Sequence, residues 1–104
     1  MAFIDIYGAS GTAYRFRRWS TSEAHPPMAG NFALVAEQSG KVVAVGVTDD
    51  LSGAVRELET IAPGTTLFTR LNVARRLREA EHTDLTALHP AAGHRPPAEP
   101  SSAA

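Results

Sequence analysis

The chain of 104 residues contains no cysteine. Disulfides and thiolate metal sites are therefore excluded, and this composition suits a reducing cytoplasm. No apolar run approaches the ~20 residues of a membrane span, so we expect no membrane partner. The N-terminus lacks a basic region and reaches a carboxylate at Asp5, which is not the pattern of a secretory signal. We therefore expect a cytoplasmic protein.

A strong net charge is also lacking. The formal net charge is −1, which gives no overall attraction to a polyanion. Nine of the ten basic residues are arginine, and most lie at 15–18 and 70–78. A guanidinium group fits phosphate and carboxylate better than an ammonium group does. These clusters suit phosphate contacts, and they equally suit solvated faces.

Segments rich in β-branched and aromatic residues predict five strands. They cover residues 3–7, 13–19, 31–37, 41–47 and 65–70. Residues 1–19 form an N-terminal β-hairpin. The run Val42–Val45 is apolar on both faces, which is typical of a central strand covered on both sides.

Two helices complete the predicted fold. Thr48 is expected to cap the first, with Asp49 and Asp50 in its first turn, and this helix ends near Ile61. Asn72 or a neighbour is expected to cap the second. The order β-β-β-β-α-β-α predicts an α+β fold with a small mixed or antiparallel sheet and two packed helices.

Proline marks the end of the predicted domain. Pro90 stops the second helix near His89. Residues 91–104 are rich in proline and alanine and are expected to form a disordered tail. Residues 1–90 therefore form a single domain.

The second predicted helix carries two acids within its apolar stripe. On a helical wheel, Glu81 and Asp84 fall among the apolar residues. The apolar members are Val73, Ala74, Leu77, Ala80, Leu85 and Leu88. Charged residues are rarely buried without a partner. The acids could pair with arginine or backbone amides, or remain solvated where the last turns of the helix extend beyond the sheet. They could also form a site that holds a divalent metal or orients a base.

Residues 30–90 resemble the GIY-YIG nuclease superfamily. Gly30-Asn31-Phe32 stands at the first tyrosine motif and Ala44-Val45-Gly46 at the second, with eleven residues between Phe32 and Ala44. The run Gly46–Leu51 matches the Gly-x-Thr-x-x-Leu turn into a helix. The run Arg78–Glu81, followed by Pro90, matches the helix that carries a metal-binding glutamate. The N-terminal hairpin is similar to an extension in small bacterial members.

The resemblance implies that Glu81 occupies the position of the metal ligand. Both motif tyrosines are replaced, because Phe32 has no hydroxyl for proton chemistry and Ala44 keeps no functional group. The family's arginine would stand at Ala54, and Arg56 lies roughly 200° around the helix from it. We therefore expect a catalytically degenerate domain rather than an enzyme. The alternative is a Mg²⁺- or Mn²⁺-dependent DNA endonuclease with relocated catalytic groups.

The expected partner is nucleic acid or another protein. Nucleic acid would bind weakly through Arg15, Arg17, Arg75 and Arg78. Trp19 shares a strand face with Arg15 and Arg17, where it could stack on a base or cover part of the core. A protein-interaction module would instead expose an apolar patch or form a homodimer along an edge strand.

Other chemistry-bearing residues predict no site. The run Gly8–Gly11 joins two strands and lacks a Gly-Lys-Ser/Thr ending, so it predicts a hairpin turn rather than a phosphate loop. The four histidines lack metal-pair spacing, and we expect them on the surface. They are His25, His82, His89 and His94.

Overall fold

The computed structural model describes residues 2–20, 22–58 and 63–91. Five strands in this part of the chain form one antiparallel sheet in the spatial order β1-β2-β5-β3-β4. The strands are β1 (Phe3–Tyr7), β2 (Ala13–Trp19), β3 (Gly30–Ala36), β4 (Val42–Thr48) and β5 (Thr65–Leu71). The helices are α1 (Leu51–Leu58) and α2 (Arg75–Thr86). The predicted α+β class and element order are confirmed.

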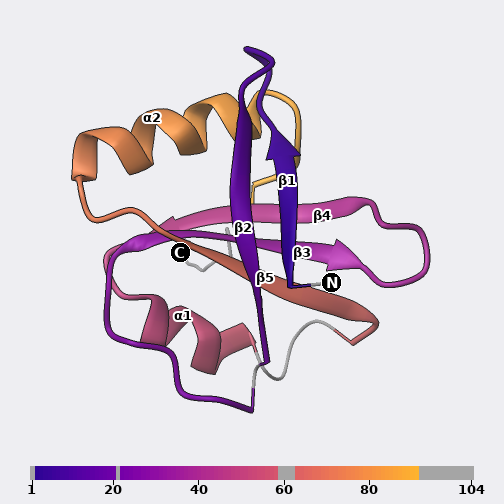
Figure 1. Ribbon diagram of the computed structural model, residues 1–104, viewed down its shortest axis with the longest axis vertical. Coiled ribbons are helices and arrows are strands. Elements are labelled where there is room, and N and C mark those ends of the chain that lie inside the picture. The colour runs from indigo at the N-terminus through magenta and orange to yellow at the C-terminus, as the bar shows by residue number, and fades with distance from the viewer. Residues whose placement is uncertain (1, 21, 59–62, 92–104) are drawn as a thin grey trace, which may run out of the picture.

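The β1–β2 hairpin crosses the other three strands, as Figure 1 shows. All of β1 pairs with β2, from Phe3 opposite Arg17 to Tyr7 opposite Ala13. In contrast, β2 joins β5 only through residues 17–19. Because only one end of β2 is bonded to β5, the hairpin turns away from the sheet and its tip reaches α2. The sheet is therefore curled.

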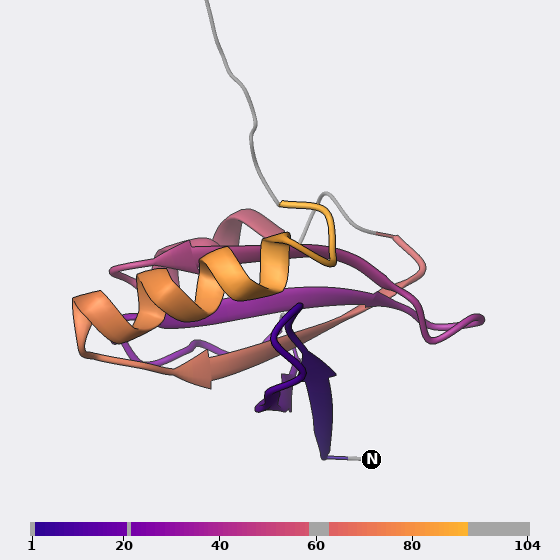
Figure 2. The same ribbon diagram turned by 90° about the horizontal axis from the view of Figure 1, so that it is seen from above.

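The two helices pack on opposite faces of the sheet. Neighbouring residues of a strand point to opposite faces, and β3 supplies both cores in this way. Ala33 and Val35 join the cluster of α2, which includes Leu85. Leu34 joins the cluster of α1, which includes Val55. Figure 2 shows α2 running alongside β3 and β4.

Strand β4 lies at the edge of the sheet, and the prediction of a central strand is wrong. Val43 is 44% exposed. The central strand is β5, whose Leu67 and Phe68 are buried in opposite clusters. The edge is partly covered by chain after α2, because the Val45 N–H donates to the Pro90 carbonyl at 2.9 Å. That cover explains why the apolar pattern of β4 resembles a central strand.

Asp50, rather than Thr48, provides the cap of α1. The Asp50 Oδ1 accepts a hydrogen bond from the Ser52 N–H at 3.0 Å, and Thr48 Oγ1 accepts one from the Asp50 N–H at 3.1 Å. The Ser52 hydroxyl also donates to Asp50, and this bond lowers the pKa of the carboxyl. The predicted end of this helix at Ile61 falls outside the described residues.

Helix α2 begins later than predicted. Its N-cap is Ala74, with no side-chain cap bond, and its last residue is Thr86. Asn72 does not cap it and instead donates to Glu81. None of the helices among the described residues is long and apolar enough to cross a membrane. The predicted tail, apart from Ala91, lies outside the described residues.

Candidate functional site

Helix α2 packs a largely polar face against the sheet. Leu85 is its only buried residue among those described. Val73, Leu77 and Leu88 are 65%, 58% and 57% exposed. Of the apolar residues predicted to share one stripe, Leu85 is the one that is buried. Polar partners on the sheet set the orientation of the helix.

Glu81 forms an ion pair with Arg70 of β5 at the seam between helix and sheet. The Arg70 Nε donates to Oε1 at 2.8 Å and a terminal nitrogen donates to Oε2 at 3.3 Å. Asn72 adds bonds to Glu81 at 3.0 Å and to Asn31 at 3.1 Å. The fully buried Asn31 donates in turn to the Arg78 carbonyl. Of the three alternatives for Glu81, pairing with arginine is the one that the structure shows.

A divalent metal does not fit this arrangement. Both oxygens of Glu81 already accept hydrogen bonds from Arg70. A metal would leave a largely buried guanidinium without its counter-ion, which is costly. Over residues 2–20, 22–58 and 63–91, no group of three or more His, Cys, Asp or Glu could hold a metal ion. Metal binding by Glu81 therefore remains a prediction from the sequence alone.

Asp84 fastens the β1–β2 hairpin to α2. It accepts hydrogen bonds from the Ser10 N–H at 2.8 Å, the Ser10 hydroxyl at 2.6 Å and the Tyr14 hydroxyl at 2.7 Å. The Ser10 and Tyr14 bonds lower the pKa of Asp84. Burial, together with Asp84, raises the pKa of Tyr14. A Cβ on Gly8 would lie 2.1 Å from the Asp84 carboxylate, so this contact requires glycine.

Phe32 and Ala44, which the sequence resemblance aligns with tyrosines, lie on the other face of the sheet, next to α1. Phe32 pairs with Gly46 across β3 and β4, and a Cβ on Gly46 would lie 2.2 Å from the Phe32 ring. Ala44 packs against the same cluster. Glu81 contacts the opposite face through Arg70. The structure therefore does not bring Glu81 together with Phe32 and Ala44.

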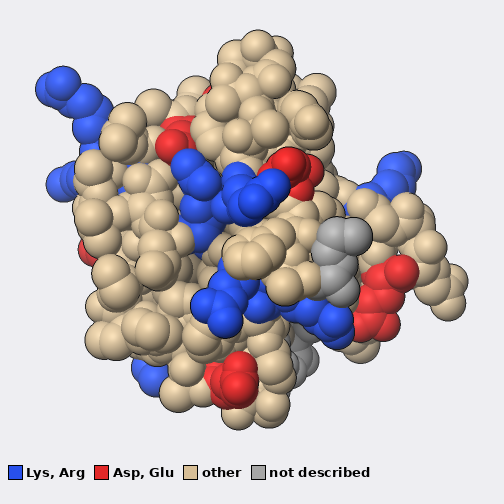
Figure 3. Space-filling model, viewed as in Figure 1, with Lys and Arg blue, Asp and Glu red and all other residues tan. Residues whose placement is uncertain are grey.

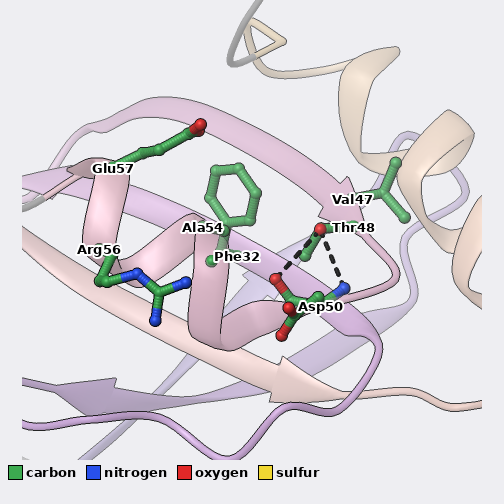
Figure 4. A pocket seen from close by; sticks show the side chains of 8 residues that line it. Phe32, Val47, Thr48, Asp50, Ala54, Arg56 and Glu57 are labelled. Atoms are coloured by element: carbon green, nitrogen blue, oxygen red, sulfur yellow. Dashed lines mark hydrogen bonds between the residues drawn. The ribbon is translucent and has the colours of Figure 1, made fainter.

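A shallow groove opens beside Phe32, between β4 and α1 (Figure 4). Ala54 lies beside the Phe32 ring, and Arg56 also lines the groove from α1. Asp50 lies on the rim, where its carboxylate caps α1 by accepting a hydrogen bond from the Ser52 N–H. The groove has an apolar floor at Phe32 and Ala54, and its charged lining residues are Asp50, Arg56 and Glu57.

A second hollow, which we call the arginine cleft, lies on the β1–β2–β5 part of the same sheet face. Its lining residues are Phe3, Arg15, Arg17, Trp19, His25, Pro26, Thr69, Arg70 and Leu71. The Arg15 guanidinium lies 5.7 Å from the centroid of the Phe3 ring, and that of Arg17 lies 5.7 Å from Trp19. Figure 3 shows basic side chains gathered in the middle of this view, over the position of β2 in Figure 1. The cleft alternates positive charge with aromatic surface.

His25 forms a buried wall of the arginine cleft, and the prediction of a surface histidine is wrong for it. Only 5% of the residue is exposed. Its Nδ1 lies 2.9 Å from the Pro26 carbonyl, and its Nε2 lies 3.0 Å from the Thr69 hydroxyl. Because a carbonyl only accepts, the Nδ1–H donates to the Pro26 carbonyl, and Nε2 shares a hydrogen bond with the Thr69 hydroxyl. No local pattern could reveal this, since Thr69 is 44 residues away in the sequence.

Arg75 and Arg78 do not belong to the arginine cleft. Arg75 pairs with Glu79 at 3.1 Å on the surface of α2. Arg78 donates to the Val73 carbonyl at 2.8 Å, and both arginines line a different groove near the end of β4. The four predicted nucleic-acid-binding residues therefore form two separate pairs, Arg15 with Arg17 in the arginine cleft and Arg75 with Arg78 in the other groove.

Comparison of the chain with protein-family models, curated proteins and solved structures finds no match. The likeness to the GIY-YIG superfamily therefore stays a prediction from sequence.

Proposed function

We propose that the protein is a nucleic-acid-binding module on a catalytically degenerate GIY-YIG-like frame, and that it binds single strands in the arginine cleft. The observation that carries this proposal is the alternation of two guanidinium groups with two aromatic rings on one open sheet face. Proteins that bind single strands combine a basic groove with aromatic side chains on which bases stack.

The two arginines are available for phosphate. Arg17 is exposed, and in the part of the chain that the structure describes it forms no ion pair. Arg15 pairs with Asp5 at 3.2 Å, with side chains that are 67% and 41% exposed. Exposed pairs of this kind contribute roughly 0–1 kcal/mol. A phosphate oxygen can therefore replace Asp5 at small cost.

The aromatic rings provide the surface for bases. Phe3 is 46% exposed on β1, and Trp19 is half-buried at the other end of the cleft. Stacking of a base on such a ring contributes about 1–3 kcal/mol. An unpaired base can reach Phe3, whereas a base within a duplex is already stacked on both sides. Single strands are therefore the favoured ligand.

The degenerate frame is supported by the order of elements and by what the family positions lack. From Gly30 onward the order is β3-β4-α1-β5-α2, the order that the resemblance implies. Phe32 and Ala44 carry no proton-transfer group, and Glu81 is engaged by Arg70. These features favour binding over cutting.

Trp19 is the only tryptophan, so its fluorescence reports directly on the arginine cleft. The test is a titration with an oligonucleotide of about 15 nucleotides, single-stranded DNA or RNA, a length that suits such sites. We expect quenching of Trp19 and an affinity that falls with salt, with a slope near −0.7 for each phosphate contacted. Arg17→Ala removes one phosphate contact. It should therefore reduce the magnitude of this slope by about 0.7 and weaken binding to all sequences to the same extent.

The matched control is Arg56→Ala, which removes an exposed arginine from α1. It should leave the affinity unchanged. Absence of binding at low salt, or an equal loss in Arg56→Ala and Arg17→Ala, would refute the proposed site. Plasmid nicking with Mg²⁺ or Mn²⁺ that disappears in Glu81→Ala would instead support the endonuclease alternative.

A further inference from the structure

Another hollow lies next to the arginine cleft, and we call it the distal hollow. Its lining includes Arg17, Arg18, Trp19, Glu37 and Thr66. Arg17 and Trp19 also line the arginine cleft, so the two hollows meet at these side chains. In Figure 3, the basic side chains in the middle of the view form two neighbouring groups along the position of β2 in Figure 1. A ligand in the arginine cleft can therefore continue past Trp19.

Trp19 stands between the two hollows and is held in place from two sides. Its indole N–H donates to the Glu23 carbonyl at 3.0 Å, and the centroid of its ring lies 4.3 Å from that of His25. His25 is itself buried and bonded to Pro26 and Thr69. A side chain that is already ordered loses little entropy when a ligand binds to it. Trp19 is therefore a preorganised stacking surface where the two hollows meet.

Arg18 provides a positive charge that is available in the distal hollow. Its side chain is exposed, and in the part of the chain that the structure describes it forms no ion pair. Because neighbouring residues of a strand point to opposite faces, Arg15 and Arg17 share one face of β2 and Arg18 lies on the other. The distal hollow is thus lined from both faces of the sheet, at the end of β2. A strand that contacts all three arginines passes around this end.

Glu37 is the one acid among the described lining residues of the two hollows. It follows β3, and β5 lies between β3 and β2 in the sheet. Two strand spacings put it roughly 10 Å across the sheet from β2. Glu37 and Arg18, which both belong to the described chain, form no ion pair with each other. Phosphate is therefore attracted to the β2 side of the distal hollow, and Glu37 limits the site on the β3 side.

We propose that a single strand bound in the arginine cleft continues around Trp19 into the distal hollow, where Arg18 contacts a further phosphate. Such an extension rests on the proposed function, because it requires a strand in the arginine cleft. The four residue steps of β2 from Arg15 to Trp19 span about 13 Å, which matches about four stacked nucleotides at about 3.4 Å each. A strand of about eight nucleotides, well within the range of such sites, is long enough to enter the distal hollow as well.

Titrations with single strands of about four and about eight nucleotides test the extension. Trp19 fluorescence reports on both, because Trp19 lines both hollows. At about −0.7 for each phosphate contacted, Arg15 and Arg17 give a salt slope of about −1.4 for the short strand, and Arg18 brings that of the long strand to about −2.1. Arg18→Ala should return the long strand to about −1.4 and leave the short strand unchanged. Unchanged binding of the short strand also shows that this variant is folded.

Two further variants separate charge from position. Arg18→Lys keeps the charge and should keep the steeper slope of the long strand. The matched control Arg76→Ala removes an exposed arginine of α2 that lines neither hollow, and it should change neither slope.

Each possible outcome decides between the extension and the arginine cleft. Equal slopes for the two strands, or a steeper slope that Arg18→Ala leaves intact, would overturn the extension while the arginine cleft stands. A loss in Arg76→Ala as large as that in Arg18→Ala would do the same. Absence of binding by both strands at low salt would instead refute the proposed function, and the extension with it.

Discussion

The two helices are attached to the same sheet by different physical means. Helix α1 buries three apolar side chains, Leu51, Val55 and Leu58. Helix α2 buries Leu85 and is otherwise held by the Arg70–Glu81 ion pair and the Asp84 hydrogen bonds. Hydrophobic contacts are largely insensitive to protonation, whereas the contacts of Asp84 depend on the charge of its carboxyl. The attachment of α2 should therefore respond to pH, and that of α1 should not.

The largest effect is expected from Leu51→Ala in α1. Leu51 is fully buried, and truncation of such a residue leaves a cavity that costs about 3 kcal/mol in the free energy of unfolding. Urea denaturation measures the loss, which should be similar in mildly acidic and neutral buffer. The exposed Glu57→Ala on the same helix is the control and should change little. A loss for Leu51→Ala that grows strongly as the pH falls would break the contrast between the helices.

A smaller but substantial loss is expected from Glu81→Ala in α2. It removes the counter-ion of Arg70, whose side chain is only 28% exposed, at a cost of about 2 kcal/mol. Glu79→Ala is a matched control, because it also breaks an Arg–Glu pair, with side chains that are 80% and 58% exposed. The control should cost less than about 0.5 kcal/mol. Equal losses in urea denaturation would show that the Arg70–Glu81 seam is not what holds α2.

The contact between the β1–β2 hairpin and α2 should make the free energy of unfolding depend on pH under both acid and alkaline conditions. Since the pKa of Asp84 is lowered in the fold, its contribution is complete above the ordinary value of 3.8 and is lost as the pH falls through the folded pKa. The pKa of Tyr14 is raised above 10.0, so its contribution is present below that value and is lost as the pH rises through the folded pKa. Asp84→Asn should flatten the acid limb of a stability–pH profile, and Tyr14→Phe the alkaline limb. Unchanged profiles in both variants would contradict this account.

The smallest effect on stability is expected from Leu77→Ala on the exposed side of α2. Leu77 is 58% exposed, so the change should stay within about 0.5 kcal/mol at low protein concentration. Leu85→Ala, on the buried side of the same helix, should cost about 3 kcal/mol. Chemical denaturation of both variants sharpens the comparison within α2. A large loss for Leu77→Ala would show that this side chain packs internally.

The strands could be predicted from the sequence because their signals are local. Residues 3–7 and 13–19 match β1 and β2, and the other strands differ by one residue at their ends. The helix starts were less accurate, since both Thr48 and Asp50 can cap and the choice depends on the bond to Ser52. The neighbours of β4 could not be read from its own residues, because the order of strands depends on long-range pairing.

The candidate site was predictable only in part. Arg15, Arg17 and Trp19 share a strand face by simple alternation, and the structure places them together in the arginine cleft. The orientation of α2 could not be derived, because a helical wheel does not include the partners that Glu81 and Asp84 find on distant strands. The tertiary ion pair and hydrogen bonds outweighed the apolar periodicity.

The short contact of Val45 with the chain after α2 has a consequence for the handling of the protein. The Pro90 carbonyl and the parallel bridge to Ala91 occupy part of the free side of β4. An uncovered edge strand is a template for pairing with other chains and for aggregation. A shortened version that stops before Pro90 would uncover this edge, so a minimal soluble fragment should extend through Ala91.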